Sequence, residues 1–405
     1  MVVATVVAWL VAASYSAAGL ALLLGASPRS YPIDLRLRWI EHRLTYQAQN
    51  PQTAGHPDHE LPASHEGMRT LGGSYPPWSY TLGMALIPPL QWRWTVAYFW
   101  GLNVIALVTL ALWAFWRLRS VDARLATLAA AIPLTNFAAA ICVSYGQYGV
   151  LVAGLLVGSA IALRRGESVA AGVLLALALV KPQLSAPFVL GLACQGRLAT
   201  PAIAAGAAGV AWLAMAWWVD TPALQLLNAA AAESSYFHYL SHNPLTRWLT
   251  PAIGRLPTIL ILAVAGAAAV AAYAFRRRES GDPFDLLAVA AVVAMFWSYR
   301  RHYDVALMSI PLVHALGGAA RSGSPWQWGI FLAAGITLWL PVRHTMWEAP
   351  WVQGSTLIVW LALLLSIWVT SSPRYGPPVR YAFSPGVDLR EWWTSVTRRP
   401  VRSGS

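Results

Sequence analysis

The sequence predicts an all-α polytopic membrane protein. Of its 405 residues, 57% are hydrophobic and only 11% are charged, and the mean hydropathy is +0.51. Soluble domains contain about 25% charged residues. Apolar runs bounded by charges, Pro or Gly recur along almost the whole chain, as expected of successive membrane-spanning helices.

These runs predict a bundle of about 12 transmembrane helices. The first is preceded by no basic segment, so we expect an uncleaved span rather than a secretory signal. A long polar stretch follows it and predicts a functional outer loop. The expected spans are 2–24, 94–116, 123–144, 148–163, 168–180, 184–195, 199–219, 252–274, 284–299, 304–319, 326–342 and 354–371.

Charge and cysteine content narrow the classes of partner. The net charge is +12, but the arginines form short clusters between apolar runs, which is typical of contacts with membrane lipids and phosphates. No basic face indicates nucleic acid. Cys142 and Cys194 lie in apolar stretches, so neither a disulfide framework nor a thiolate metal site is expected.

The distribution of basic residues predicts that both termini are cytoplasmic. Residues 1–371 then form one transmembrane catalytic domain, and residues 372–405 form a basic cytoplasmic tail. The loops 25–93, with interfacial helices, and 220–251 both lie outside. Lys181 and the segment 298–304 lie on the same outer face, as an active site at the surface of a cytoplasmic membrane requires.

Lys181 is the one lysine in a chain with 27 arginines, and it interrupts apolar sequence. Charged groups inside a membrane are costly and are usually paired, solvated or functional. Because Pro182 follows, we expect a helix break at the charge. A lysine that lines a polar cavity is our preferred interpretation, and an interfacial lysine that caps a short span is the alternative.

Asp34 is the first carboxylate of the chain and begins a segment of alternating apolar and charged residues. The segment predicts an amphipathic helix on the bilayer surface, with Arg36, Arg38 and Arg43 available to lipid phosphates. A carboxylate in a first helical turn is also favoured electrostatically. Asp34 is therefore either a catalytic group or a helix-start residue without chemistry.

Other segments suit substrate contacts. Tyr75, before a rigid Pro-Pro turn, offers a flat face for a sugar or a lipid groove, and Gln147 is a strong hydrogen-bonding side chain where the fourth span begins. Arg300, Arg301 and His302 together would neutralise a phosphate. Alternatively, these arginines contact lipid headgroups while the nearby Asp304 pairs with one of them.

Two possible sites are disfavoured. The histidines and acids of residues 56–66 lack a helical His pair at i, i+4, so we expect a solvated loop and no metal. The chain has no Walker A or GxGxxG sequence, and no soluble region large enough to hold a nucleotide. We therefore expect no cofactor, and any sugar donor should be lipid-linked.

The order of motifs resembles glycosyltransferase family 87. These motifs are Asp34 after the first span, Tyr75-Pro-Pro, Gly146-Gln, Arg164-Arg-Gly and Lys181-Pro-Gln, and the resemblance covers roughly residues 1–320. Members of this family are polyprenol-phosphate-mannose-dependent mannosyltransferases of the GT-C superfamily. The resemblance implies a GT-C-type bundle with a long outer loop after the first span.

The resemblance also implies roles for individual residues. Asp34 corresponds to the catalytic base, and Lys181 stands where the family carries its Lys-Pro. Asn243 resembles the Asn of an Asn-Gln-Ser pattern that in this chain reads Asn-Pro-Leu-Thr, and His302 corresponds to the expected histidine. Gln183 completes the Lys-Pro-Gln motif and is expected to contact substrate.

Together these observations predict a membrane hexosyltransferase. It would move a hexose, mannose by resemblance, from a polyprenyl-phosphate sugar to a lipid- or glycan-linked acceptor by a single inverting displacement. A transporter or flippase of a lipid-linked substrate is the alternative. Transporters often have inverted repeats with paired broken helices, and only one clear break, at Lys181, is evident in this chain.

Overall fold

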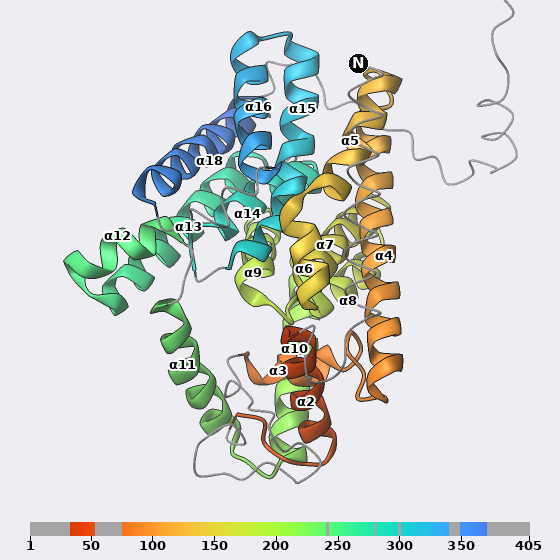
Figure 1. Cartoon of the computed structure of the whole chain (residues 1–405), viewed down its shortest axis with the longest axis vertical. Helices are drawn as coiled ribbons and strands as arrows, with labels where there is room; N and C mark the ends of the chain where they lie inside the picture. Colours follow the sequence, from red (N-terminus) through yellow and green to blue (C-terminus); the bar gives the residue numbers. More distant parts are fainter. Residues whose placement is uncertain are drawn as a thin grey trace, which may run out of the picture. The chain divides into compact units, whose positions relative to one another are not determined.

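The computed structural model describes residues 33–52, 75–239, 243–278, 281–298, 301–339 and 349–370. All of them belong to one compact unit. The described residues form helices and turns and contain no strand (Figure 1). The expected first span, the 56–66 loop, the tail and Arg300 lie outside the described residues, as does the side chain of His302.

The helices are numbered in chain order. They are α2 (Ile33–Tyr46), α3 (Pro77–Gly83), α4 (Trp92–Leu118), α5 (Ala123–Thr135), α6 (Phe137–Tyr145), α7 (Gly149–Arg164), α8 (Ser168–Ala178), α9 (Pro182–Cys194), α10 (Ala199–Trp218), α11 (Ala223–Tyr239), α12 (Pro244–Ile253), α13 (Arg255–Arg276), α14 (Pro283–Ala294), the 3₁₀ helix η2 (His302–Met308), α15 (Ser309–Ser322), α16 (Pro325–Trp339) and α18 (Pro350–Thr370).

Within the described residues, five helical segments are long and apolar enough to cross a membrane. They are α4, α10, α13, the continuous segment Tyr303–Ser322 and α18. α5 and α6 add a sixth candidate if their 40° bend is counted within one span.

Every other expected run among these residues also forms a helix, but most of these helices are short. The longest of the short apolar helices, α7, has 16 residues. Such a helix reaches about 24 Å, less than a hydrocarbon core of about 30 Å. The count of twelve spans therefore stays a prediction.

Local sequence explains the breaks between the short helices. Asn136 separates α5 from α6, because its side chain accepts a hydrogen bond from the backbone N–H of Ala138 and caps α6. The same side chain donates to Ser309 Oγ at 3.0 Å, which attaches the break to α15. Lys181 separates α8 from α9, where Pro182 begins the new helix.

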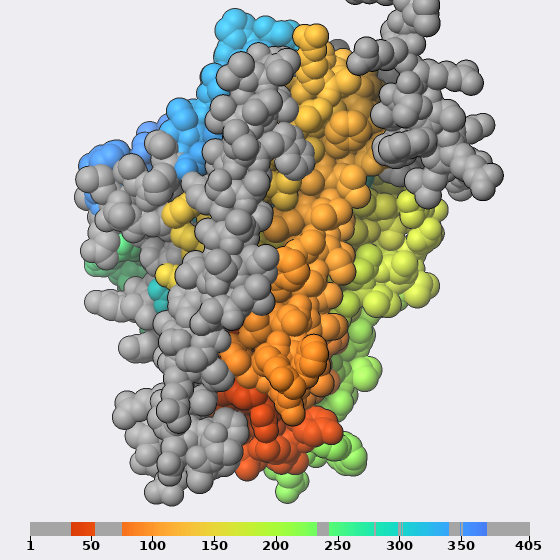
Figure 2. All heavy atoms as spheres, turned by 45° about the vertical axis from the view of Figure 1, so that its right-hand side comes forward, coloured from red at the N-terminus to blue at the C-terminus, as the bar shows by residue number. Residues whose placement is uncertain are grey.

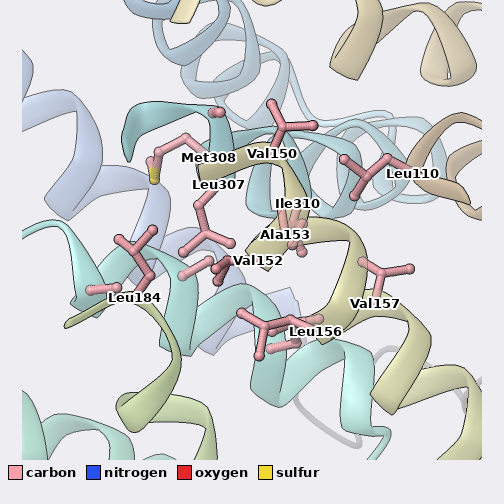
Figure 3. Close-up of a cluster of buried hydrophobic side chains, with 14 of the residues drawn as sticks. Leu110, Val150, Val152, Ala153, Leu156, Val157, Leu184, Leu307, Met308 and Ile310 are labelled. Carbon is pink, nitrogen blue, oxygen red and sulfur yellow. The ribbon is translucent and has the colours of Figure 1, made fainter. Parts of the chain in front are cut away.

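The core is built around α7, which is buried along most of its length. Figure 3 shows Leu156 of α7 among apolar side chains from η2, α9 and α15. Gly154 and Gly158 allow this packing. A Cβ added to Gly154 would lie 2.7 Å from the Ala106 Cβ in α4, and one added to Gly158 would lie 3.3 Å from Leu174 in α8. Small residues at this spacing let neighbouring helices approach closely.

α4 forms one outer face of the molecule, drawn in orange in Figure 2. Large apolar side chains are exposed along it, including Trp94 (57% exposed), Ile105 (63%) and Leu112 (53%). Exposed apolar side chains over a whole helix are expected where the surrounding solvent is lipid. This face therefore fits a membrane-spanning orientation of α4.

α2 lies beside the N-terminal part of α4, at the bottom of Figure 1. The Trp39 indole donates to the backbone oxygen of Leu90 at 2.7 Å, and Leu35 and Ile40 are fully buried. The expected helix exists, but its expected place on the bilayer surface is wrong for Arg38, which is only 6% exposed. α2 is enclosed by the protein, since Leu44 and the polar Glu41 are also fully buried and Arg38 pairs with Glu41.

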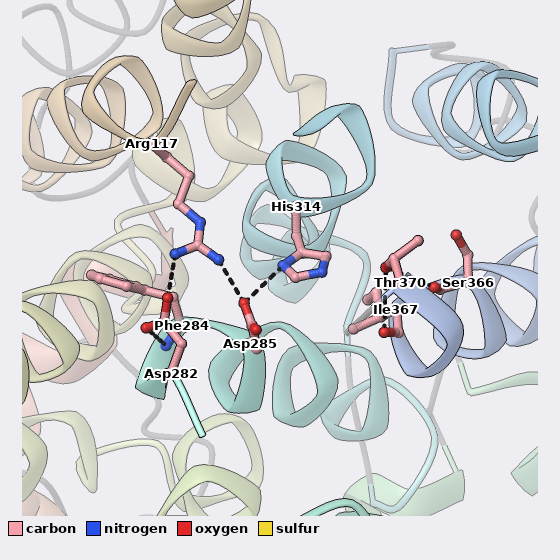
Figure 4. Close-up of polar contacts among 8 residues, drawn as sticks. All are labelled: Arg117, Asp282, Phe284, Asp285, His314, Ser366, Ile367 and Thr370. Carbon is pink, nitrogen blue, oxygen red and sulfur yellow. Dashed lines mark hydrogen bonds and ion pairs between the residues drawn. The ribbon is translucent and has the colours of Figure 1, made fainter. Parts of the chain in front are cut away.

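A separate ionic cluster joins α4, α14 and α15 (Figure 4). Arg117 contacts Asp282 at 2.6 Å and Asp285 at 2.5 Å, and His314 Nδ1 lies 3.4 Å from Asp285. These residues stand at the end of α4, the start of α14 and the middle of α15. The cluster ties three core helices together at the end of α4 that lies away from α2.

Candidate active site at the Lys181 break

Lys181 is buried, with 2% of its surface exposed, and forms an ion pair with Asp304 Oδ1. The expected helix break is confirmed, since α8 ends at Ala178 and α9 begins at Pro182. The ammonium is enclosed by protein and paired, whereas the polar cavity expected around Lys181 stays a prediction. A buried charge needs such a partner to offset its lost hydration.

Asp304 comes from η2, 123 residues further along the chain. Its second carboxylate oxygen accepts a hydrogen bond from the backbone N–H of Arg301 at 2.9 Å. The sequence suggested a neighbouring arginine as the partner of Asp304 and did not suggest Lys181. The pair joins η2 to the start of α9.

Gln147 extends the contact from Lys181 to the turn between α6 and α7. Lys181 Nζ donates to Gln147 Oε1 at 3.4 Å, and the Tyr75 hydroxyl donates to the same oxygen at 3.5 Å. Gly146 precedes Gln147 and has a φ of +72°, a conformation that favours glycine. The structure thus brings together three residues predicted from sequence: Lys181, Gln147 and Tyr75.

Aromatic rings surround these polar groups. The Lys181 ammonium lies 4.7 Å from the centre of the Tyr303 ring, and the Arg38 guanidinium lies 4.5 Å from that of Tyr75. Tyr75 also meets Tyr148 edge to face at 5.9 Å. Rings that face cations in this way hold them through the π quadrupole.

Burial raises the pKa of the Tyr75 hydroxyl, so this group stays protonated and acts as a hydrogen-bond donor. Four charged residues also act on this pKa. Lys181 and Arg38 lower it, whereas Asp304 and Asp34 raise it. Tyr75 therefore stands within electrostatic reach of both the Lys181 pair and the start of α2.

Asp34 lies in the first turn of α2 and is partly exposed. Its neighbour Leu35 packs directly on the turn that carries Gln147. A Cβ added to Gly146 would lie 2.2 Å from the Leu35 Cβ and 3.0 Å from the Leu35 backbone nitrogen. The backbone of Asp34 is thus beside the Lys181 site, and its carboxylate forms no hydrogen bond or ion pair with any described residue.

Three residues of α2 were not among the predicted site residues: Arg38, Glu41 and His42. Arg38 pairs with Glu41 at 2.5 Å, and His42 Nδ1 donates to the backbone oxygen of Ile87 at 2.6 Å. Burial raises the pKa of Glu41 to about 7 and lowers that of His42 to about 4. The sequence contained a signal for the pair, since Asp34, Arg38 and Glu41 are spaced i, i+4, i+7 and share one helical face.

Asn243 and Gln183 attach to the end of α14 rather than to Lys181. Asn243 Nδ2 donates to the backbone oxygens of Phe296 at 2.7 Å and Ser298 at 3.2 Å, and its Oδ1 accepts from the N–H of Leu245 at the start of α12. The Gln183 backbone oxygen accepts from the Trp297 indole at 2.8 Å, and its side chain is partly exposed. These contacts hold residues 296–298, which follow α14.

The site gathers the Lys181 ammonium, the Asp304 carboxylate and the Gln147 amide. A lysine ammonium has three N–H donors, and two of these face Asp304 and Gln147. Arg301 directly precedes η2, and Asp34 lies in the first turn of α2, which packs on the Gln147 turn through Leu35. Among the described residues, no group of three His, Cys, Asp or Glu side chains could hold a metal ion.

No curated protein and no solved structure matches the chain. The sequence model of glycosyltransferase family 87 matches residues 73–310, which include α3 to η2 and both partners of the Lys181–Asp304 pair. This match covers more than half of the 405 residues. Together with the apolar helices, it shows a membrane glycosyltransferase, and the chain belongs to glycosyltransferase family 87.

Proposed function

We propose that the protein transfers a hexose, mannose by family resemblance, from a polyprenyl-phosphate sugar to a lipid- or glycan-linked acceptor. Transfer takes place on the outer face of the cytoplasmic membrane. One observation carries the proposal: the buried Lys181 donates to Gln147, and the turn that carries Gln147 packs on Leu35, the residue after Asp34. A cation for the donor phosphate and a carboxylate for the acceptor hydroxyl are the groups that this reaction needs.

The reaction is a single displacement. The acceptor hydroxyl gives its proton to the Asp34 carboxylate while its oxygen forms a bond to the anomeric carbon. The bond between that carbon and the phosphate oxygen breaks on the opposite face, so the anomeric configuration inverts. The electron pair leaves with the phosphate, and the products are the glycosylated acceptor and polyprenyl phosphate.

The leaving group explains why one carboxylate is enough. A glycosidase needs a second carboxyl group to protonate a poor leaving oxygen. Here the leaving oxygen belongs to a phosphate, whose developing charge is stabilised by cations. We assign this role to Lys181, Arg300, Arg301 and His302.

Substrate contacts are assigned to the residues around Lys181. Tyr75 and Gln147 lie next to its ammonium and offer a hydroxyl and an amide to a sugar. We assign Gln183 the same role, because its partly exposed side chain is two residues from Lys181. For Asn243 we propose an indirect contribution to substrate binding, through the segment before Arg301.

A transfer assay tests the function. Purified protein is incubated with a short polyprenyl-phosphate mannose and with lipid or glycan acceptors, and the products are identified by mass spectrometry. Polyprenyl-phosphate glucose serves as a parallel donor, and Asp34→Asn protein serves as the negative control. We expect acceptor mass to increase by one hexose in the parent only. Translocation of the donor in proteoliposomes with no hexosylated product would instead identify a flippase.

A further inference from the structure

Asp304 is held from two sides. One carboxylate oxygen accepts from Lys181 and the other accepts from the backbone N–H of Arg301. The side chain is fully buried, and a Cβ added to Gly149 would lie 3.8 Å from the Asp304 Cα. Asp304 therefore cannot turn away from Lys181 without losing the hydrogen bond at the start of η2.

This arrangement fixes the direction of the Lys181 ammonium. Asp304 receives one N–H and Gln147 Oε1, at 3.4 Å, is the acceptor for a second. Lysine has three such donors. The third N–H has no hydrogen-bond acceptor among the described residues, although the ammonium also lies 4.7 Å from the centre of the Tyr303 ring. A donor phosphate would accept from this N–H.

The fixed charge of Asp304 has a second effect, on the phosphate product. The donor is a phosphodiester with one negative charge, whereas the product is a monoester that carries about −1.5 to −2 at neutral pH. A carboxylate within a few ångströms repels the more highly charged product more strongly. At an effective dielectric constant of about 20, one added charge at such a distance changes an affinity by about tenfold or more.

We infer that Asp304 is a positioning residue with a role in product release. It holds Lys181 with one N–H directed to the donor phosphate, and its negative charge favours departure of the polyprenyl phosphate product. The inference rests on the proposed function, in which Lys181 binds the donor phosphate.

The test compares Asp304→Asn with the parent. Asparagine keeps the size of the side chain and an acceptor oxygen but removes the charge. The measurements are kcat, the KM for polyprenyl-phosphate mannose and the inhibition constant of polyprenyl phosphate. We expect kcat to fall and the ratio of inhibition constant to donor KM to fall about tenfold. Asp304→Glu, which keeps the charge, should retain the parental ratio.

Asp285→Asn is the matched control, because Asp285 is also a carboxylate paired with a cation but belongs to the Arg117 cluster. It should lose stability and keep the parental ratio. A parental ratio in Asp304→Asn would overturn the inference, since loss of packing alone lowers kcat without favouring the product. If Asp304→Asn does not fold, the ratio of inhibition constant to donor KM is measured in Lys181→Gln and in Lys181→Gln/Asp304→Asn. Equal ratios in these two proteins would overturn the inference.

The same series separates the inference from the proposed function. Lys181→Gln with an unchanged donor KM would remove the phosphate role itself. A raised donor KM in Lys181→Gln, combined with a parental ratio in Asp304→Asn, would remove the role of Asp304 alone.

Discussion

Gly146 lies directly against Leu35. A Cβ at Gly146 would stand 2.2 Å from the Leu35 Cβ and 3.0 Å from its Cα, so only glycine permits this approach. The contact places α2, with Asp34 in its first turn, on the turn that carries Gln147. The position of the proposed base, Asp34, relative to the proposed phosphate ligand, Lys181, therefore depends on the close contact between Gly146 and Leu35.

We expect Gly146→Ala to disturb this contact. The added methyl group meets backbone atoms, and φ +72° disfavours alanine. Gly166→Ala is the matched control, because Gly166 has φ +79° with no atom within 4 Å. Gly146→Ala should be less stable than the control by about 1–3 kcal/mol and should lose transfer activity. Equal stabilities in thermal unfolding would contradict the clash.

Asp34→Asn should reduce transfer while leaving the fold intact. The side chain is partly exposed and forms no hydrogen bond or ion pair with the described residues, so stability should change by less than about 0.5 kcal/mol. Loss of a general base lowers a rate by about 10²–10⁴-fold. Asp220→Asn, at an exposed position after α10, is the control and should transfer at the parental rate. A parental rate in Asp34→Asn would show that another group takes the proton.

Lys181→Gln should raise the KM for the donor more than the KM for the acceptor, because the lost charge faces the donor phosphate. The variant should also be less stable, since breaking a buried ion pair costs about 3–5 kcal/mol. Arg117→Gln breaks another buried ion pair, in the α4–α14 cluster, and should lower stability without changing either KM. Equal changes in both KM values for Lys181→Gln would argue against the phosphate role.

His42 should make the protein sensitive to acid. Burial lowers the pKa of His42 to about 4, whereas the unfolded chain has the ordinary value near 6.5. The folded state then binds fewer protons than the unfolded state between these values. The contribution of His42 to the free energy of unfolding, about 3 kcal/mol, is complete above pH 6.5. It is lost as the pH falls to about 4.

Thermal unfolding between pH 7.5 and 4 measures this effect. His42→Asn keeps a donor for the backbone oxygen of Ile87 but does not titrate. We expect its unfolding temperature to fall less with acid than that of the parent. Parallel curves for the two proteins would show that His42 is protonated equally in the folded and unfolded states.

Local chemistry made much of the fold predictable. Apolar runs predicted the helices, and Pro182 predicted the break after Lys181, because the steric effect of proline acts on its immediate neighbours. The number of spans could not be tested in the same way, because several helices are shorter than a membrane is thick.

The candidate site, too, could be predicted only in part. Residue types and their order predicted the candidate groups: an isolated lysine, a carboxylate at a helix start and a cationic segment near Asp304. Folding in three dimensions was needed to pair Lys181 with Asp304, to join Lys181 to Tyr75 through Gln147, and to bury Arg38 rather than leave it facing lipid. Periodicity and proline effects act over a few residues, whereas these partners are brought together from distant segments by packing.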